Sequence, residues 1–430
     1  MSADPNPYRH YLRWILGTVA GASAAVAGFV LLVDPYGLYA LADIPGFNRV
    51  KPPVERYRNE IRLARAERFR PEIVIAGNSR MEVGVDPDGP HLADRNAFNL
   101  ALAGTSTALA VDQVRYLARG GHPPRHVIAG MEFVDALTNQ PLPPGTVAPV
   151  QPEPPSGWRA HAWRADTLYS FASLKDALVT VAIQRQPQAA MATLRGHNPL
   201  LQYHQAAATE GYAALFSQRA AENTRKLAAA AAGGLHVPAV RAQAAALIDT
   251  AAGADPEVAI DLVIYPYHAQ LMALFEQAKL WPRFEAWKAI LVEEAEAGRR
   301  RHPAARIAVH DFSGYGAIQC EPVPAPGSTA RTRWYWEAGH FKPALGDVMV
   351  ARVLGRVDRR APAEFGFRLD RGTLDANRDR IAAERAGCLA RQAALFDGVA
   401  RDVERELGRR SASSAPQRRQ AALGTAPTVE

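Results

Sequence analysis

The chain has 430 residues, of which 48% are hydrophobic, so it is long enough for one large domain with additions and has ample apolar surface for a core. Its net charge of +7 arises from 50 Lys and Arg against 43 Asp and Glu. These basic residues form no compact stripe with interleaved aromatics, which argues against a nucleic-acid partner. The two cysteines, Cys320 and Cys388, are too few for a cysteine-rich zinc site or a disulfide-dense scaffold. Whether they pair with each other or remain two small buried hydrophobes stays open.

The first predicted element is a transmembrane helix over residues 15–33, which contain no charged residue. At about 1.5 Å per residue this stretch roughly spans a hydrocarbon core of about 30 Å. Two arginines and Trp14 precede it, whereas no Lys or Arg occurs between Asp34 and Asn48. The positive-inside rule therefore places residues 1–14 in the cytoplasm and the rest of the chain outside.

Two other interpretations of this apolar segment are weaker. A cleaved signal peptide needs a small-x-small site, but Phe29 to Val33 runs apolar directly into Asp34. A buried core helix is disfavoured by the length and by the lack of a polar face. The sequence thus predicts a single-pass protein of a bacterial-type inner membrane, with its main domain periplasmic or extracellular.

Residues 34–137 are expected to form the first part of an α/β domain. A highly charged surface helix within 52–70 leads into the short apolar strand 73–76. A second strand is predicted at 98–103, followed by a helix, and a third begins at 126–130. Strand, helix and strand at this spacing are typical of right-handed parallel βαβ units.

The remaining chain is expected to complete this α/β domain around an insertion. The insertion is Pro-rich and loop-like to about Trp158 and then Ala-rich and helical. Strand and helix patterns return after it, with strands near 259–265 and 306–311 and a helix from Pro343. The expected parts are a helical insertion at 138–255, the second part of the domain at 256–360, an amphipathic helical segment at 361–410 and a disordered tail at 411–430.

Ser79 is the candidate nucleophile. It lies just after the Gly77-Asn78 turn that ends the first strand. In open α/β sheets, ligands bind at the carboxyl ends of the strands, and a small turn leaves the next hydroxyl accessible. The alternative is that Ser79 is only a turn residue or a helix N-cap.

The best candidate base is His340, which follows Glu337 by three residues. A carboxylate at this spacing can accept the imidazole Nδ1–H and fix the tautomer while Nε2 faces a serine. The pair is alternatively a surface contact or a metal-ligand pair on a helix. Metal binding needs more ligands, and the sequence has no HExxH motif, P-loop or GxGxxG, so neither a metal nor a cofactor is expected.

Three further residues are candidates for the site, and two of them have an alternative interpretation. His268 ends a strand at the same sheet edge, so it is either a substrate contact and alternative base or a packed histidine. Arg80 either binds substrate or forms an ion pair with Glu82, Glu132 or Asp311. Asp311 is the second choice for the acid that orients a histidine.

These motifs resemble those of the SGNH (GDSL-like) hydrolase superfamily. The resemblance rests on Gly77-Asn78-Ser79-Arg80, on the block from Asn99 to Gly104 and on Glu337-Ala-Gly-His340. It is closest to the membrane-anchored branch, which includes proteins acting in O-acetylation of exported polysaccharides. It implies a flavodoxin-like doubly wound parallel sheet, a Ser79 nucleophile, a His340 base oriented by Glu337, and an oxyanion hole formed by the amides of Ser79 and Gly104.

The chain departs from the family pattern at two positions. The usual acid is Asp, whereas Glu337 is one methylene longer. The third block of the family carries an Asn that donates to the oxyanion, where this chain has Glu132. Losing one such donor typically costs about 10²- to 10³-fold in rate unless another, such as Asn78 or Asn99, replaces it.

The resulting expectation is an exported serine esterase or O-acyltransferase, with a glycan as substrate and a membrane acyl-transfer protein as partner. The alternative is a catalytically inactive scaffold of the same fold that binds a polysaccharide or an assembly partner.

Overall fold

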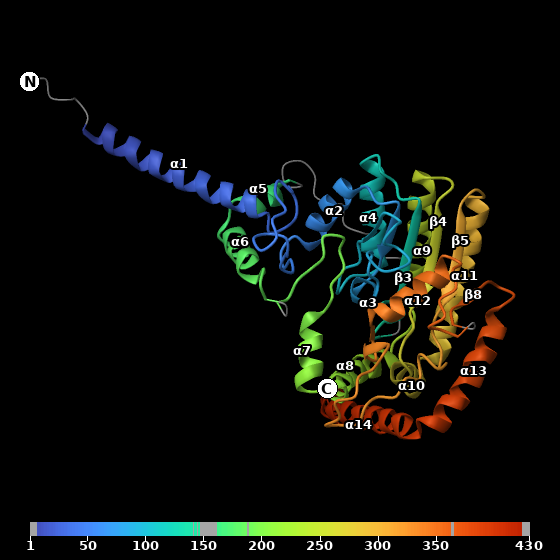
Figure 1. Cartoon of the computed structure of the whole chain (residues 1–430). Coiled ribbons are helices and arrows are strands. Elements are labelled where there is room, and N and C mark those ends of the chain that lie inside the picture. The colour runs from blue at the N-terminus through green and yellow to red at the C-terminus, as the bar shows by residue number, and fades with distance from the viewer. Residues whose placement is uncertain are drawn as a thin grey trace, which may run out of the picture. The chain divides into compact units, whose positions relative to one another are not determined.

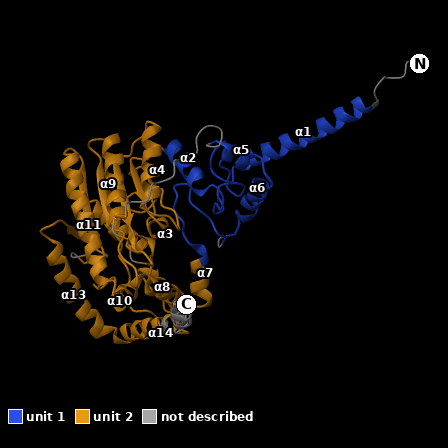
Figure 2. Ribbon diagram, turned by 180° about the vertical axis from the view of Figure 1, so that it is seen from behind, with its two compact units in different colours: residues 1–69, 151–202 blue, residues 70–150, 203–430 orange. Residues whose placement is uncertain are grey.

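The computed structural model describes residues 7–140, 142–143, 145–146, 161–186, 189–362 and 365–423. The chain forms two compact units, one comprising residues 1–69 and 151–202 and the other residues 70–150 and 203–430 (Figure 2). Most of the Pro-rich stretch predicted as a loop up to Trp158 lies outside the described residues, as do residues 1–6 and 424–430 of the predicted cytoplasmic and disordered ends.

The second unit is built on a six-stranded sheet in the order β2-β1-β3-β4-β5-β8 (Figure 1). The first five strands of this order are parallel, and β8 pairs antiparallel with β5. The prediction of an α/β fold with a parallel sheet is confirmed. The strands are β1 (Ile73–Ala76), β2 (Ala97–Asn99), β3 (His126–Met131), β4 (Ala259–Ile264), β5 (Arg306–Asp311) and β8 (Phe367–Leu369).

The sequence of these strands explains their central place. Every residue of β1 and β4 is buried, as expected for parallel strands that are covered on both faces. Ile73 pairs with His126, and Ala259 pairs with both His126 and Arg306, so β1, β3, β4 and β5 start nearly level. Their carboxyl ends therefore meet along one edge.

Three helices pack side by side in one layer against the sheet. They are α4 (Thr107–Arg119), α9 (Val237–Ala254) and α11 (Trp281–Arg301), with α9 in contact with both others. Gly298 of α11 permits this approach, because a Cβ there would lie 2.8 Å from Ile248 of α9. Although α9 falls within the stretch expected to be an insertion, it belongs to this helical layer and contacts both α4 and α11.

A short hairpin precedes helix α12 (Pro343–Val353), where the sequence predicted only a loop. Its strands are β6 (Tyr335–Glu337) and β7 (His340–Phe341), and β7 contacts α3 (Ser79–Gly84). The glycines Gly84 and Gly346 let α3 and α12 touch, because a Cβ on Gly346 would lie 1.7 Å from the carbonyl oxygen of Gly84. The hairpin is thereby held beside the helix that starts with Ser79.

The C-terminal helices are tied to the sheet by a disulfide bond. Cys320, in the loop after β5, is bonded to Cys388 of α13 (Leu374–Arg391). Helix α14 (Ala393–Leu423) follows, so the helical stretch predicted from Leu374 breaks at Gln392 and continues into the segment expected to be disordered from 411.

The first unit contains the apolar N-terminal helix α1 (Pro7–Val33), the one described helix that is long and apolar enough to cross a membrane. The other helices that lie wholly within it are α2 (Arg58–Phe69), α5 (Ala162–Leu168) and α6 (Phe171–Ile183). The end of α1 packs against α6, where Val30, Val33 and Ala177 form a small buried cluster.

The disulfide bond predicts a large effect on stability. Cys320 and Cys388 are separated by 68 residues, and closing a loop of that length stabilises the folded chain by about 4 kcal/mol in the chain-entropy model. We expect the double variant Cys320→Ser/Cys388→Ser, purified in detergent, to unfold at a clearly lower urea concentration than the parent. Wild type treated with a thiol reductant should match the variant. An unchanged midpoint in both samples would contradict a stabilising role.

Candidate active site

Ser79 is the first residue of helix α3, immediately after the turn that ends β1. Asn78 is the N-cap, and its Oδ1 accepts a hydrogen bond of 3.1 Å from the amide of Arg80. Gly77 has a φ of +142°, which side-chain-bearing residues rarely adopt, and a Cβ there would lie 2.9 Å from Met81. The turn therefore depends on glycine, and it brings the Ser79 side chain to the carboxyl edge of the sheet.

The structure brings Ser79, His340 and Glu337 together in one hydrogen-bonded chain. Nε2 of His340 lies 2.9 Å from Oγ of Ser79, and Nδ1 of His340 is hydrogen-bonded to Oε1 of Glu337. The second Glu337 oxygen accepts the amide of Gly339 at 2.7 Å. With the proton on Nδ1, Nε2 is free to accept the serine proton.

The β6–β7 hairpin explains how Glu337 comes to be hydrogen-bonded to His340. Glu337 ends β6 and His340 begins β7, and the two residues are paired across the tight turn. The glutamate side chain is 1% exposed. Burial favours its neutral form, but the adjacent His340 ring and the Gly339 amide outweigh burial and lower the pKa of Glu337 below its ordinary value. A carboxylate is therefore present beside the imidazole at neutral pH.

Glu132, just beyond the end of β3, accepts four hydrogen bonds. Its donors are the side-chain amide of Asn78 at 3.0 Å, the Arg80 guanidinium, the hydroxyl of Tyr267 at 3.0 Å and the amide of Val134 at 3.0 Å. Of the ion pairs considered for Arg80, the structure shows the one with Glu132. Glu132 is thus an acceptor that orients Asn78 and Arg80.

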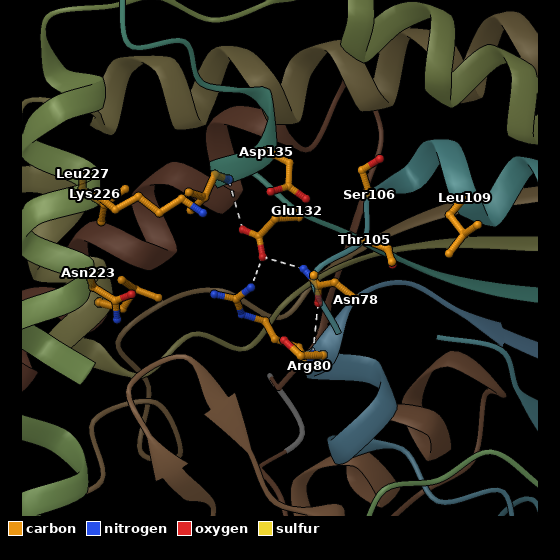
Figure 3. A pocket seen from close by; sticks show the side chains of 14 residues that line it. Asn78, Arg80, Thr105, Ser106, Leu109, Glu132, Asp135, Asn223, Lys226 and Leu227 are labelled. Atoms are coloured by element: carbon orange, nitrogen blue, oxygen red, sulfur yellow. Dashed lines mark hydrogen bonds and ion pairs between the residues drawn. The ribbon is translucent and has the colours of Figure 1, made fainter. Parts of the chain in front are cut away.

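A cavity of about 530 Å³ opens beside Ser79 at this edge of the sheet. Ser79 and Gly104, whose amides the sequence resemblance assigns to an oxyanion hole, both line it. Figure 3 shows Glu132 and Arg80 between Asn78 on one side and residues of α8 (Tyr212–Ala231) on the other. The lining residues are Asn78, Ser79, Arg80, Gly104, Thr105, Ser106, Leu109, Glu132, Val134, Asp135, Asn223, Lys226, Leu227 and Leu271.

Several polar residues of this cavity were not identified from the sequence, and they include Asp135, Asn223 and Lys226. Asp135 follows the third strand closely, so its position at the strand end was a usable signal. Asn223 and Lys226 belong to α8, whose Ala-rich sequence gives no indication that it borders the site. Burial and the nearby Glu132 raise the pKa of Asp135 to about 6, against the opposing effect of Lys226.

Asn78 and Asn99 were proposed from the sequence as oxyanion donors, but their side-chain amides are hydrogen-bonded to other groups. Asn99 is fully buried, and its side-chain amide donates to the carbonyl oxygens of Met81 and Val85 at 2.8 and 2.7 Å. These bonds hold α3 against β2, so Asn99 is not available to an oxyanion. The side-chain amide of Asn78 is engaged with Glu132.

His268 is likewise fully buried and serves as the N-cap of α10 (Ala269–Gln277). Its Nδ1 accepts the amide of Gln270 at 3.1 Å, and its Nε2 lies 2.8 Å from the carbonyl oxygen of Glu321. Burial lowers its pKa to about 4. With both nitrogens engaged, His268 offers neither a base nor a ligand contact.

Asp311 also has partners other than a histidine. It accepts hydrogen bonds from the buried ammonium of Lys288 at 3.2 Å and from Asn377 at 2.7 Å. These bonds join β5 to α11 and α13, which is a structural role. Among the described parts of the chain, no group of three or more His, Cys, Asp or Glu residues is placed to hold a metal ion.

The raised pKa of Asp135 predicts a pH-dependent stability. The folded state disfavours its ionised form, so Asp135 destabilises the protein above about pH 6, and this penalty disappears as the pH falls from about 6 toward the ordinary value of 3.8. We expect Asp135→Asn to raise the free energy of unfolding at pH 8 by on the order of 1–2 kcal/mol, with a smaller gain at pH 5.

Urea unfolding of the full chain in detergent at both pH values measures this effect. The exposed carboxylate of Asp397 provides the control, and Asp397→Asn should leave the difference between the two pH values unchanged. A gain from Asp135→Asn that is equal at pH 8 and pH 5 would contradict the assignment.

Comparison of the chain with protein-family models, with curated proteins and with solved structures found no match.

Proposed function

We propose that this protein is a membrane-anchored, exported serine esterase or O-acyltransferase that acts on acyl esters of a glycan. The observation that carries the proposal is the hydrogen-bonded chain from Ser79 through His340 to Glu337, beside a cavity at the carboxyl edge of a parallel sheet. A nucleophile, a base with a free Nε2 and a buried carboxylate that orients the base are the parts needed for acyl transfer.

In the first half-reaction, Oγ of Ser79 attacks the acyl carbonyl carbon while Nε2 of His340 removes the hydroxyl proton. The tetrahedral intermediate collapses to an acyl-serine as His340 returns that proton to the leaving alkoxide. In the second half-reaction, a hydroxyl group of the acceptor, or water, gives its proton to His340 and attacks the acyl-serine, and Ser79 regains its proton. The buried carboxylate of Glu337 stabilises the imidazolium that forms in each half-reaction.

The negative charge of each intermediate needs donors, and the backbone supplies two. The amide of Ser79 is the first of α3, so it has no acceptor within its helix, and the amide of Gly104 comes from the facing loop. Arg80 is our candidate for the third donor that the family resemblance assigns to an Asn. Its Nε is buried and has no hydrogen-bond partner among the described residues, while its Nη1 holds Glu132.

The lining of the cavity favours a small acyl group and a hydroxylated acceptor. Asp135, Asn223 and Lys226 present donors and acceptors, whereas the apolar part of the wall is limited to a few side chains such as Leu109 and Leu227. Such a wall can hydrogen-bond sugar hydroxyls but lacks the extended apolar surface that a long acyl chain requires.

Other features support the membrane-anchored SGNH-like assignment. The order 2-1-3-4-5 of the parallel strands is that of flavodoxin-like sheets, in which ligands bind where the order reverses, between β1 and β3. Ser79 and Glu132 follow these two strands. The Cys320–Cys388 disulfide is typical of an oxidising compartment, and α1 supplies the membrane anchor. The choice of a glycan rests on the family resemblance.

A second candidate function is a catalytically inactive scaffold that binds a polysaccharide in the same cavity. The observation that favours it is Glu132, an acceptor at the position of an expected oxyanion donor, which also engages the side-chain amide of Asn78. An ionised carboxylate near the oxyanion opposes the build-up of negative charge.

A fluorophosphonate probe separates the two functions. We expect the full chain in detergent to be labelled covalently and Ser79→Ala to be unlabelled. Glu337→Gln should lower the labelling rate or the rate of ester hydrolysis roughly 10⁴-fold, because a neutral amide cannot hold the required tautomer or stabilise the imidazolium. A folded parent protein that resists labelling would support the scaffold.

The size and polarity of the cavity predict a preference for short acyl groups. We expect kcat/KM for p-nitrophenyl acetate to exceed that for p-nitrophenyl octanoate by roughly tenfold or more, which corresponds to at least about 1.4 kcal/mol of transition-state stabilisation. Ser79→Ala provides the background rate for both esters. Equal values, or a preference for octanoate, would contradict this account of the cavity.

A further inference from the structure

Helix α6 lies alongside the last part of α1 and not beyond its end. The Tyr169 hydroxyl, at the turn between α5 and α6, is 2.7 Å from Oγ of Ser23 in α1. Farther along α6, Asp176 accepts a hydrogen bond of 2.7 Å from the hydroxyl of Tyr36, just after α1 ends. Ala177, next to Asp176 in α6, packs against Val30 and Val33 at the end of α1. The start of α6 is therefore level with Ser23.

The length of α1 places this contact inside a bilayer. Residues from Trp14 to Val33 carry no charge and extend roughly 30 Å, so all of them are needed to cross the hydrocarbon core. Ser23 lies about 15 Å along the helix from Val33. If the membrane ended at Ser23, the span would have to include Arg9 and Arg13 and would still be too short.

The exposed face of α6 is suited to lipid. Phe171 is 86% exposed, and Tyr169 and Leu178 are each 56% exposed. Lys175 is the one charged residue on this face, because Asp176 is engaged by Tyr36. A helix on the surface of a water-soluble domain normally turns polar residues outward. Here the outward residues are apolar, and they are largest at the end that lies level with Ser23.

Two backbone amides and one hydroxyl at this end have protein partners in place of water. Ser170 and Ser173 form a capping box in which Oγ of Ser170 accepts the amide of Ser173 at 3.1 Å, and Oγ of Ser173 accepts the amide of Ser170 at 2.9 Å. The Tyr169 hydroxyl is bonded to Ser23. Polar groups that enter a bilayer need such internal partners, since no water is available to them.

We infer that the tip formed by residues 169–171 inserts into the outer half of the bilayer beside α1, with lipid acyl chains in contact with Phe171. Lys175 and Arg164, which flank the tip in the sequence, have long apolar stems that allow their charges to extend toward the lipid headgroups. Asp166 is neutralised by its ion pair with Arg56. The protein is thus held in the membrane by a spanning helix together with a partly inserted helical pair. The inference depends on α1 crossing the membrane and is independent of the proposed activity.

Depth-dependent quenching tests this inference on the full chain. Because both native cysteines are paired in the disulfide, a single cysteine introduced at Phe171→Cys can carry an environment-sensitive fluorophore. The variant is reconstituted into vesicles of phosphatidylethanolamine and phosphatidylglycerol that contain lipids with a nitroxide on the acyl chain. Val19→Cys in α1 reports insertion of the anchor, and Glu60→Cys, on the exposed side of α2, is the control in water.

We expect the nitroxide lipid to remove most of the fluorescence at positions 171 and 19 and to leave that at position 60 unchanged. Quenching at 19 without quenching at 171 would overturn the inference and leave the anchor in place. Fluorescence that survives at both positions would show that α1 does not span the bilayer and would overturn the inference as well. Equal quenching at 60 and 171 would also overturn it, because the effect would then not be specific to the tip.

Discussion

A single buried carboxylate, that of Glu132, connects the parts on which the site depends. Glu132 directly follows β3. Its carboxylate accepts hydrogen bonds from Asn78 and Arg80, the two residues that flank Ser79, and from Tyr267 beyond β4. These bonds fix the turn after β1 relative to the neighbouring strands. A buried carboxylate without such partners is strongly unfavourable. Glu132 and Arg80 therefore each stabilise the buried charge of the other. The position of the Ser79 hydroxyl is a consequence of this arrangement.

The net charge of the Glu132–Arg80 pair bears on which of the two proposed functions the site can support. Arg80 neutralises Glu132 and lies over the rings of Tyr265 and Tyr267 at 5.5 and 5.2 Å, so the pair contributes little net charge to the cavity. In the proposed mechanism, a neutral pair of this kind leaves the backbone amides of Ser79 and Gly104 as the dominant dipoles near the reacting carbonyl. The proposed catalysis therefore requires that Arg80 stay charged. Glu132 raises the pKa of Arg80 enough to outweigh burial, which ensures this.

The sequence was most informative about the strand ends that form the candidate site. The Gly77-Asn78 turn after the first apolar strand located one edge of a parallel sheet. The Glu337-x-x-His340 spacing predicted a pair that does form. The β6–β7 hairpin that presents this pair was not predicted, because its strands are two or three residues long and depend on contacts with α3 and α8. The wall of the cavity formed by α8 was missed for a similar reason. Alanine-rich helices have high helix propensity but no pattern that specifies which surface they cover.

The disulfide has a consequence for when the site is assembled. Cys320 and Cys388 enclose a stretch of chain that includes both Glu337 and His340, whereas Ser79 lies outside this covalent ring. Residues near the N-terminus are synthesised first, so β1 and the turn before Ser79 exist before the ring can close. The segment that carries Glu337 and His340 is enclosed by the ring only after Cys388 has been synthesised and oxidised. In a reducing environment the ring stays open, so this segment lacks a constraint on which the turn at Ser79 does not depend.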